Sequence, residues 1–262
     1  YNKKLTIMKI IFKALFLFIT LGISAQQSAT ESEVITKALQ EMVALTNTTI
    51  IKNIAFSNIG PTIMRGRVAD IDVNPNDPTE FYVGYASGGL WYTKNNGTSF
   101  RPVLDNSPTQ NIGDIAVDWN NGTIWVGTGE KNSSRSSYAG IGMLKSDNQG
   151  KTWEHVGLSD SHHVSRIVIN ANNPKEVVVG VIGHLYSPNE ERGIFKTIDG
   201  GKTWKKTLFI NNDTGIIDVV VAPENPNVLY AASWERERTA WRFDGDGNNS
   251  AIYKSIDGGK TG

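Results

Sequence analysis

Short apolar segments fill the chain from about residue 68 to its end, and turn residues separate them. The segments are four to seven residues long and rich in Val, Ile, Tyr, Phe and Trp, which favours strands over helices. They fall into four groups of successive strands. The predicted first strands are Val68–Val73, Ile112–Asp118, Val164–Asn170 and Ile216–Ala222, the second are Phe81–Tyr85, Thr123–Thr128, Val177–Ile182 and Val228–Trp234, the third are Leu90–Thr93, Gly142–Ser146, Gly193–Thr197 and Ala251–Ser255, and fourth strands begin at Phe100, Trp153 and Trp204.

One turn sequence recurs after each third strand, in the order hydroxyl, any residue, Asp or Asn, any residue, Gly, any residue, Thr or Ser, aromatic. Its copies are Thr93–Phe100, Ser146–Trp153, Thr197–Trp204 and Ser255–Gly262. We expect the Asp or Asn side chain to accept backbone N–H bonds from two or three residues later. The glycine should adopt a left-handed conformation. The residues with this structural role are Asn95, Gly97, Asn148, Gly150, Asp199, Gly201, Asp257 and Gly259.

The four turn glycines are separated by 53, 51 and 58 residues. A period near fifty residues with four short strands predicts an all-β fold, a β-propeller with one four-stranded blade per repeat. About four blades are expected, at residues 59–104, 105–156, 157–209 and 210–262. The last turn copy ends at Gly262, where the aromatic should stand. We therefore expect a fragment whose partners include missing C-terminal blades of the same protein.

The first residues have the layout of a signal peptide. Met8 is the expected start, Lys9 and Lys13 precede the apolar run Ala14–Ile23, and Ala25 offers a small residue for cleavage. The run is too short to span a bilayer comfortably. The prediction is a protein without a membrane span, exported to the periplasm, the cell surface or the medium.

Residues 26–58 form a segment of a different kind. Apolar and polar residues alternate with helical spacing between Val34 and Val43. Ser32 is the expected N-cap, and Asn47-Thr48-Thr49 should end the helix. A helical lead-in therefore precedes an incomplete propeller at residues 59–262.

Charge and composition exclude several functions. The chain has 26 basic and 26 acidic residues, and removal of the leader, with Lys3, Lys4, Lys9 and Lys13, leaves 22 basic residues. A mildly acidic surface argues against nucleic acid as a partner. The chain has no cysteine, so neither disulfides nor thiol chemistry contribute. No cofactor is expected.

The repeated turn resembles that of the Asp-box, or BNR-repeat, β-propellers. This superfamily includes sialidases, sortilin-type receptors, xyloglucan-degrading glycosidases and a photosystem assembly factor. The resemblance covers the chain from about Ile59 and implies the fold, while propellers host many unrelated activities. Further segments resemble large exported bacterial proteins labelled sortilin-like or "glycosyl hydrolase, BNR repeat": Gly60-Pro61, Gly66-Arg67-Val68, Gly88-Gly89-Leu90-Trp91, Val126-Gly127-Thr128-Gly129-Glu130 and Glu191-Arg192-Gly193.

Two enzyme groups of that superfamily imply specific residues. Sialidases need an arginine triad, and no matching arginine motif precedes the first blade here. The xyloglucan-degrading enzymes carry an Asp two residues before a Gly-Gly in the first blade, as half of a carboxylate pair. Here Ala86-Ser87 precedes Gly88-Gly89, so that carboxylate is absent.

The irregular segments should gather on one face of the propeller. In an antiparallel blade, second-to-third loops and blade-to-blade connections leave the same end, opposite the repeated turns. We call this end the loop face and expect ligands to bind there. Its predicted segments are Ile59–Arg67, Asp105–Asn111, Gly129–Ile141, Gly157–His163, Gly183–Arg192, Asn211–Gly215 and Glu235–Ser250.

Candidate chemistry on the loop face centres on Glu130, which could act as an acid, base or ligand, or could cap its own glycine-rich loop. Glu191 is its candidate catalytic partner, with Glu190 and Asp160 as alternatives. The pair His162-His163 could bind an anion or a metal, but no spaced third ligand is evident, so no metal site is predicted. The candidate ligand-binding residues are Arg67, Asn132, His162, His163, Arg166, Arg192 and Arg236.

Three functions stay open on this sequence. The leading prediction is a non-catalytic exported propeller that binds a protein, peptide or glycan across the loop face. The alternative is a glycoside hydrolase acting on polysaccharide or glycoconjugate, with Glu130 and Glu191 as its catalytic pair. The third is a structural module of a larger surface protein.

Overall fold

The structure, a computed structural model, describes residues 29–54, 66–135 and 137–260. Helix α2 (Ser32–Thr48) precedes four antiparallel sheets, the blades. The first contains β1 (Val68–Val73), β2 (Phe81–Tyr85), β3 (Gly89–Thr93) and β4 (Arg101–Pro102), and the second β5 (Ile112–Asp118), β6 (Thr123–Thr128), β7 (Met143–Ser146) and β8 (Glu154–His155). The third contains β9 (Val164–Ile169), β10 (Val177–Val181), β11 (Gly193–Thr197) and β12 (Lys205–Leu208), and the fourth β13 (Thr214–Ala222), β14 (Asn225–Glu235) and β17 (Ile252–Ser255), with hairpin β15 (Glu237–Arg238)–β16 (Phe243–Asp244) inserted.

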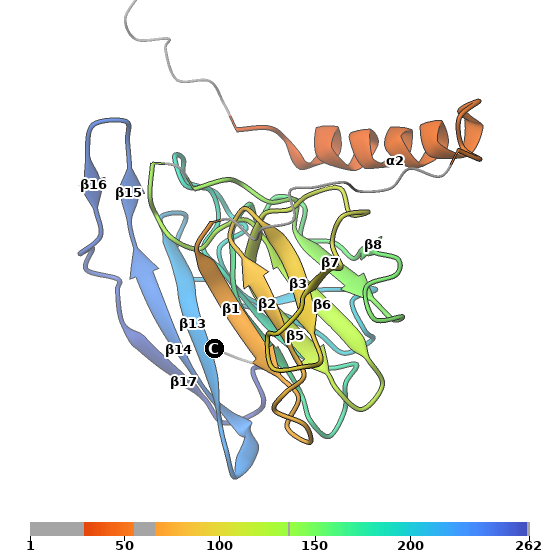
Figure 1. Ribbon diagram of the computed structural model, residues 1–262. Coiled ribbons are helices and arrows are strands. Elements are labelled where there is room, and N and C mark those ends of the chain that lie inside the picture. Colours follow the sequence, from red (N-terminus) through yellow and green to blue (C-terminus); the bar gives the residue numbers. More distant parts are fainter. Residues whose placement is uncertain (1–28, 55–65, 136, 261–262) are drawn as a thin grey trace, which may run out of the picture. The chain divides into compact units, whose positions relative to one another are not determined.

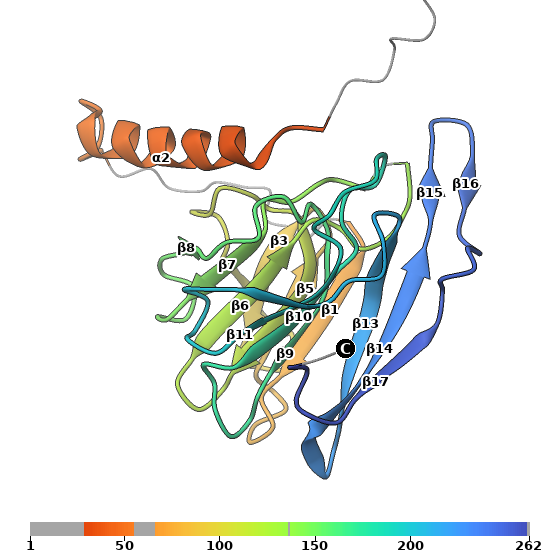
Figure 2. The ribbon, with the colours of Figure 1, turned by 180° about the vertical axis from the view of Figure 1, so that it is seen from behind.

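The blades are consecutive along the chain, and each pairs its strands in sequence order (Figures 1 and 2). The first strands β1, β5, β9 and β13 contact one another from blade to blade, so they form the inner edge of the array. This is a partial β-propeller of about four blades, as the period of the turns predicts. The predicted strands are confirmed with shifts of a few residues at their ends.

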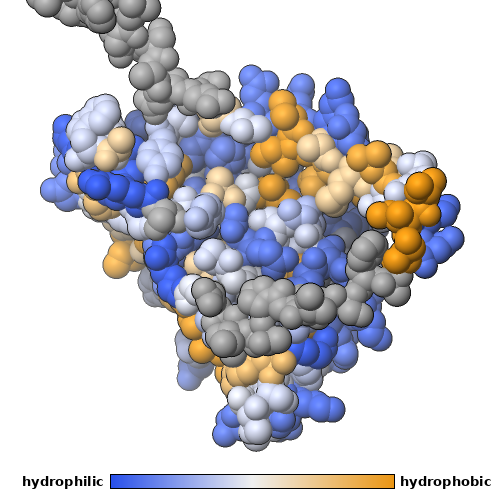
Figure 3. Space-filling view, turned by 45° about the horizontal axis from the view of Figure 1, so that its top comes forward, coloured by the Kyte–Doolittle hydropathy of each residue, from blue (hydrophilic) through white to orange (hydrophobic). Residues whose placement is uncertain are grey.

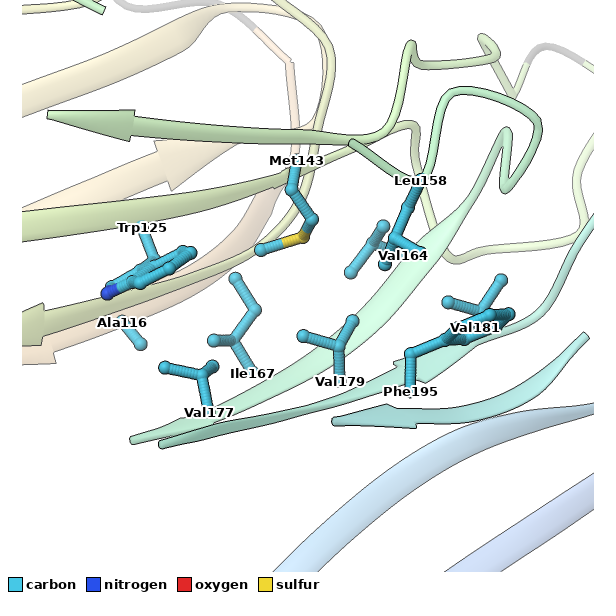
Figure 4. Close-up of a cluster of buried hydrophobic side chains, with 10 residues drawn as sticks. All are labelled: Ala116, Trp125, Met143, Leu158, Val164, Ile167, Val177, Val179, Val181 and Phe195. Carbon is cyan, nitrogen blue, oxygen red and sulfur yellow. The ribbon is translucent and has the colours of Figure 1, made fainter. Parts of the chain in front are cut away.

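The core lies between neighbouring blades. Strand β10 directs Val177, Val179 and Val181 toward the second blade, where they pack with Trp125 and others (Figure 4). The intervening Val178 packs toward the fourth blade. Because a middle blade is covered on both faces, its central strand is apolar at every position, unlike a strand with one solvated face.

Aspartates on the inner strands join successive blades. Asp72 on β1 accepts hydrogen bonds from the Val117 N–H (2.9 Å) and from Trp119 Nε1 (2.6 Å) of the second blade. Asp114 on β5 in turn accepts the Ile167 N–H of the third blade (2.7 Å). These carboxylates, buried at Asp114 and partly buried at Asp72, supply hydrogen bonds between first strands that are not paired in one sheet.

The repeated turns have the predicted left-handed glycines, with φ of +93° at Gly201. Asp257 accepts the Lys260 N–H at 3.0 Å, three residues later as expected, while the Asp199 carboxylate accepts the Thr203 N–H at 3.0 Å, four residues later. The N–H two residues after Asp199, that of Gly201, donates instead to Thr197 Oγ1 at 2.9 Å. The same bond, from the glycine N–H to the hydroxyl oxygen, recurs in the other turns: Gly97 donates to Thr93, Gly150 to Ser146 and Gly259 to Ser255.

The tryptophans that end the second and third turns reach the preceding blade. Trp153 Nε1 donates to the Val103 carbonyl (2.9 Å), and Trp204 Nε1 donates to the Val156 carbonyl (2.6 Å). Trp204 also meets Trp125 edge-on, with ring centroids 6.2 Å apart. The turn thus orders its own blade and attaches it to the previous one.

We expect Asp199→Ala to lower the melting temperature, because two donors of Thr203 and the Thr197 hydroxyl lose their acceptor. These bonds hold the pKa of Asp199 well below its usual range. A lowered pKa contributes stability that is fully present above the unfolded value near 4 and is lost progressively as the pH falls from there toward the lowered folded value, so the loss caused by Asp199→Ala should shrink over that range. Melting curves at pH 7 and pH 3 test this, with Lys202→Ala in the same turn as the control. Equal losses at both pH values would contradict it.

Helix α2 confirms the helical pattern but not the expected cap. Glu31 occupies the N-cap position without a side-chain bond, and Ser32 is the first helical residue. None of the helix residues is buried. No helix within the described ranges is long and apolar enough to cross a membrane. The predicted signal peptide lies outside the described residues.

Candidate functional site on the loop face

The strand order of the blades defines the loop face. Loops β6–β7, β10–β11 and β14–β17 leave the same ends of the blades, because every blade has the same antiparallel order. The repeated turns leave the opposite end. Figure 3 turns the loop face partly toward the viewer and shows mostly hydrophilic side chains, with hydrophobic ones gathered in the upper right of the view.

Glu130 follows β6 and is buried, but it is not an isolated carboxylate. Its Oε1 pairs with Arg67 Nε, and Asn132 Nδ2 donates to the same oxygen at 3.4 Å. Arg67 remains about half exposed and also donates to Ser134 Oγ at 3.3 Å. The hydrogen bond with the Glu130 carboxylate raises the pKa of Arg67 above its ordinary value. Three predicted site residues, Arg67, Glu130 and Asn132, therefore meet, and the group presented to solvent is a guanidinium.

His163 is hydrogen-bonded to the backbone of Glu130. Its Nδ1 lies 2.8 Å from the Glu130 carbonyl oxygen, so the nitrogen that carries the proton donates to that carbonyl. Burial first, and then the charge of Arg236, lowers the pKa of His163 to about 3. A neutral, buried imidazole attracts no anion, so its position favours a structural role over the predicted ligand contact.

The neighbouring His162 points elsewhere and meets two residues. Its ring stacks on that of His184, with centroids 3.8 Å apart and an interplanar angle of 24°. Asp160 Oδ1 lies 3.0 Å from His184 Nε2 and 3.8 Å from His162 Nε2. The sequence gives no spacing rule that links His162 to His184, because the two belong to different loops of the third blade.

Arg166 is not on the loop face. It lies on β9 at the inner edge, where its Nε contacts Asp218 (2.7 Å) and its Nη1 contacts Asp114 (3.3 Å). Lys131 Nζ lies 3.1 Å from the same Asp114 carboxylate. Arg166 thus ties three blades together, which its place inside a strand of the repeat could have indicated.

Arg192 and Arg236 are buried, and both donate hydrogen bonds to carbonyl groups of the loops. Arg192 donates to the carbonyls of His184 (2.9 Å), Ser187 (3.1 Å) and Asp213 (2.9 Å). Arg236 Nη1 donates to the Leu185 carbonyl at 3.4 Å. Burial lowers the pKa of Arg192 to about 10 and that of Arg236 to about 9. Both side chains brace the β10–β11 loop.

Glu191 has a different environment from Glu130. Burial and the nearby Asp160 charge raise its pKa, and the Asp160 N–H bonds to its carboxylate. Its Oε2 is buried without a hydrogen-bond partner among the residues that the structure describes. Glu130 and Glu191 therefore have separate partners rather than a shared site.

Exposed aromatic side chains mark the loops of three successive blades. Tyr138 on the β6–β7 loop and Tyr186 on the β10–β11 loop are 56% and 44% exposed, and Trp241 at the tip of the β15–β16 hairpin is 81% exposed. Tyr186 is held by a bond from its hydroxyl to the Arg135 carbonyl (3.1 Å). Trp234, in contrast, packs against Phe243. The two tyrosines were not among the predicted site residues.

No protein-family model matches the chain, and no curated protein matches it either. Solved structures do. The GH74 enzyme of Niastella koreensis is similar with a TM-score of 0.53 and 19% identity over 73% of this chain and 28% of that one. The GH74 xyloglucanase of Xanthomonas campestris has a TM-score of 0.51 and 17% identity over 73% of this chain and 29% of the enzyme. An ancestral GH74 enzyme has a TM-score of 0.50 and 20% identity over 70% of this chain and 26% of the enzyme.

The chain shares the β-propeller fold of these enzymes. It spans between 26% and 29% of their length. Identities of 17–20% extend the likeness to the fold alone.

Proposed function

We propose that this chain is part of an exported Asp-box β-propeller that binds a protein, peptide or glycan across its loop face. The observation that carries the proposal is the row of exposed aromatics Tyr138, Tyr186 and Trp241 on loops of successive blades. Aromatic rings stack on sugars and anchor peptides at little entropic cost. Arg67, held by Glu130, adds a donor for carboxylate or hydroxyl groups.

The other parts of this proposal rest on the sequence. The leader before Ala25 supports export, and the hydroxyl, carboxylate and glycine of the turns support the Asp-box assignment. The proposed organisation is a signal peptide at 1–25, a helical lead-in at 26–58 and an incomplete propeller at 59–262. Exposed apolar side chains on β1 (Ile71) and β17 (Ile252) are consistent with further blades packing on both ends.

Truncation of the loop aromatics tests the binding proposal. A panel of polysaccharides, including xyloglucan, and a displayed peptide library would identify a ligand. Tyr186→Ala or Trp241→Ala should then weaken its binding about tenfold or more, as for anchoring residues of other interfaces. The matched control is Ile198→Ala, an apolar residue in a turn on the opposite face whose exposure, 67%, lies between those of Tyr186 and Trp241. Equal affinity of all variants would place the ligand elsewhere.

The hydrolase alternative is favoured by one observation, the raised pKa and unpartnered Oε2 of Glu191. A raised pKa favours the protonated form of the carboxyl, which is the form that a general acid uses. Against it, the predicted partner Glu130 is neutralised by Arg67. Release of reducing sugars from xyloglucan that disappears in both Glu191→Gln and Glu130→Gln would support the enzyme. Absence of hydrolysis by the wild type supports binding without catalysis.

A further inference from the structure

Three side chains of the third blade converge on the loop face with the composition of a metal site. Asp160 and His162 lie on the β8–β9 connection, and His184 lies on the β10–β11 loop. One ligand atom from each, a carboxylate oxygen and two imidazole nitrogens, lies within 4.8 Å of the others. Both histidines are buried, while Asp160 is partly exposed at the rim.

The surroundings hold these side chains in place. His184 Nδ1 lies 3.0 Å from Ser187 Oγ, which can accept the Nδ1 proton; Nε2, 3.0 Å from Asp160 Oδ1, then carries the lone pair that a metal ligand needs. Asn189 bonds to the Asp160 carbonyl (3.2 Å) and accepts the His184 N–H (3.1 Å), so it couples the two loops. His162 has a φ of +51°, a conformation that costs a non-glycine residue energy and is found at functional sites.

We propose that Asp160, His162 and His184 bind one divalent transition-metal ion, with Zn²⁺ as the representative. Two imidazoles and a carboxylate are the donor set of catalytic zinc sites and of non-haem iron sites. Ligand atoms bound to tetrahedral Zn²⁺ lie roughly 3.3 Å apart, since each is about 2.0–2.2 Å from the metal. The distances of 3.0 and 3.8 Å from Asp160 Oδ1 to the two nitrogens bracket that value.

The charges around the cluster suit a cation. Glu191 places a second carboxylate beside Asp160 and accepts a hydrogen bond from the Asp160 N–H. The guanidinium of Arg192 is directed at the carbonyls of His184 and Ser187. Three protein ligands leave a fourth position, which the partial exposure of Asp160 opens toward the loop face. A ligand bound across this face can reach the metal there.

Metal uptake by the full chain tests the proposal. The protein, purified without a histidine tag and treated with chelator, should take up one equivalent of Zn²⁺ in calorimetry, and Zn²⁺ should raise its melting temperature. His184→Ala and His162→Ala should weaken binding about 100-fold or more and abolish the thermal shift. Ser187→Ala, which removes only the bond to His184 Nδ1, should weaken it about tenfold.

The control is His155→Gln, because His155 lies on β8 and contacts the Ile141 carbonyl, outside the cluster. It should bind Zn²⁺ as the wild type does. Circular dichroism of each variant separates loss of metal binding from loss of fold, and Ser187→Ala serves where a histidine variant unfolds. The proposal is overturned if the wild type takes up no Zn²⁺ at 100-fold excess, or if Ser187→Ala and a folded His184→Ala bind it with unchanged affinity.

Discussion

Asp114→Ala should lower the free energy of unfolding by about 3 kcal/mol or more, a loss typical of breaking a buried charged network. The Asp114 carboxylate is fully buried and accepts the Ile167 N–H (2.7 Å). It also contacts Lys131 (3.1 Å) and Arg166 (3.3 Å). Its removal leaves a buried backbone donor and two cations without their shared partner at the junction of the second and third blades.

Urea denaturation measures this loss, and Asp218→Ala is the matched control. Asp218 contacts the same Arg166 at 2.7 Å, but its side chain is 46% exposed. Exposed ion pairs contribute about 0–1 kcal/mol, so the control should cost far less. Equal losses would show that Asp114 acts only through Arg166 and not through the strand junction.

The same carboxyl predicts a pH dependence. Burial, and then the charge of Asp70, raises the pKa of Asp114 to about 7. A pKa above the unfolded value near 4 means that the protonated form stabilises the fold, and that this stability is lost as the pH rises from 4 through 7. Asp114→Asn cannot titrate, so its stability should vary less over that interval. If the stability of Asp114→Asn changed with pH as steeply as that of the wild type, Asp114 would be excluded as the source of the pH dependence.

Arg192→Ala should have the second large effect, about 3 kcal/mol of lost stability together with weakened Zn²⁺ binding. Four acceptors lose their donor at once: the carbonyls of His184, Ser187 and Asp213 and the side chain of Asn189. His184 and Ser187 belong to the proposed metal site, so the loop that positions it should loosen.

Arg192→Lys should not restore stability, because a single ammonium on a flexible stem cannot span acceptors that the planar guanidinium reaches together. Arg242→Ala, on the exposed β15–β16 hairpin, is the control and should melt as the wild type does. Thermal melting and calorimetry on all three variants give the answer. Normal stability with lost binding of the loop-face ligand would instead favour the direct ligand contact that the sequence predicts for Arg192.

Much of the fold was predictable because its signals are local. The turn Thr197–Trp204 closes through bonds between residues two to four positions apart, so the pattern of hydroxyl, carboxylate and glycine is legible in eight letters. The spacing of the turns then predicts the blade. The burial of strand β10 was also predictable from a local signal, since an unbroken apolar run indicates a strand that is packed on both faces.

The site was predictable only in part. That Glu130 and Arg67 lie on the same face follows from strand order, but their ion pair joins residues 63 positions apart. The sequence alone offers no reason to couple His162 to His184, or to separate His162 from His163. Backbone conformation decides the latter, because the left-handed φ of His162 directs adjacent side chains to different partners.

The sequence by itself determined the repeat, the strands and the end of the blades from which the irregular loops leave, because these depend on eight-residue turns and on pairing between strands that follow one another along the chain. Only the tertiary structure decided which charged residues meet. Arg166, on the third blade, contacts aspartates of the other three blades, Arg192 supports a loop, and Asp160, His162 and His184 converge. These outcomes depend on how neighbouring blades twist and pack. A charged residue that becomes buried must bond to other protein groups, so it stabilises the fold instead of contacting a ligand.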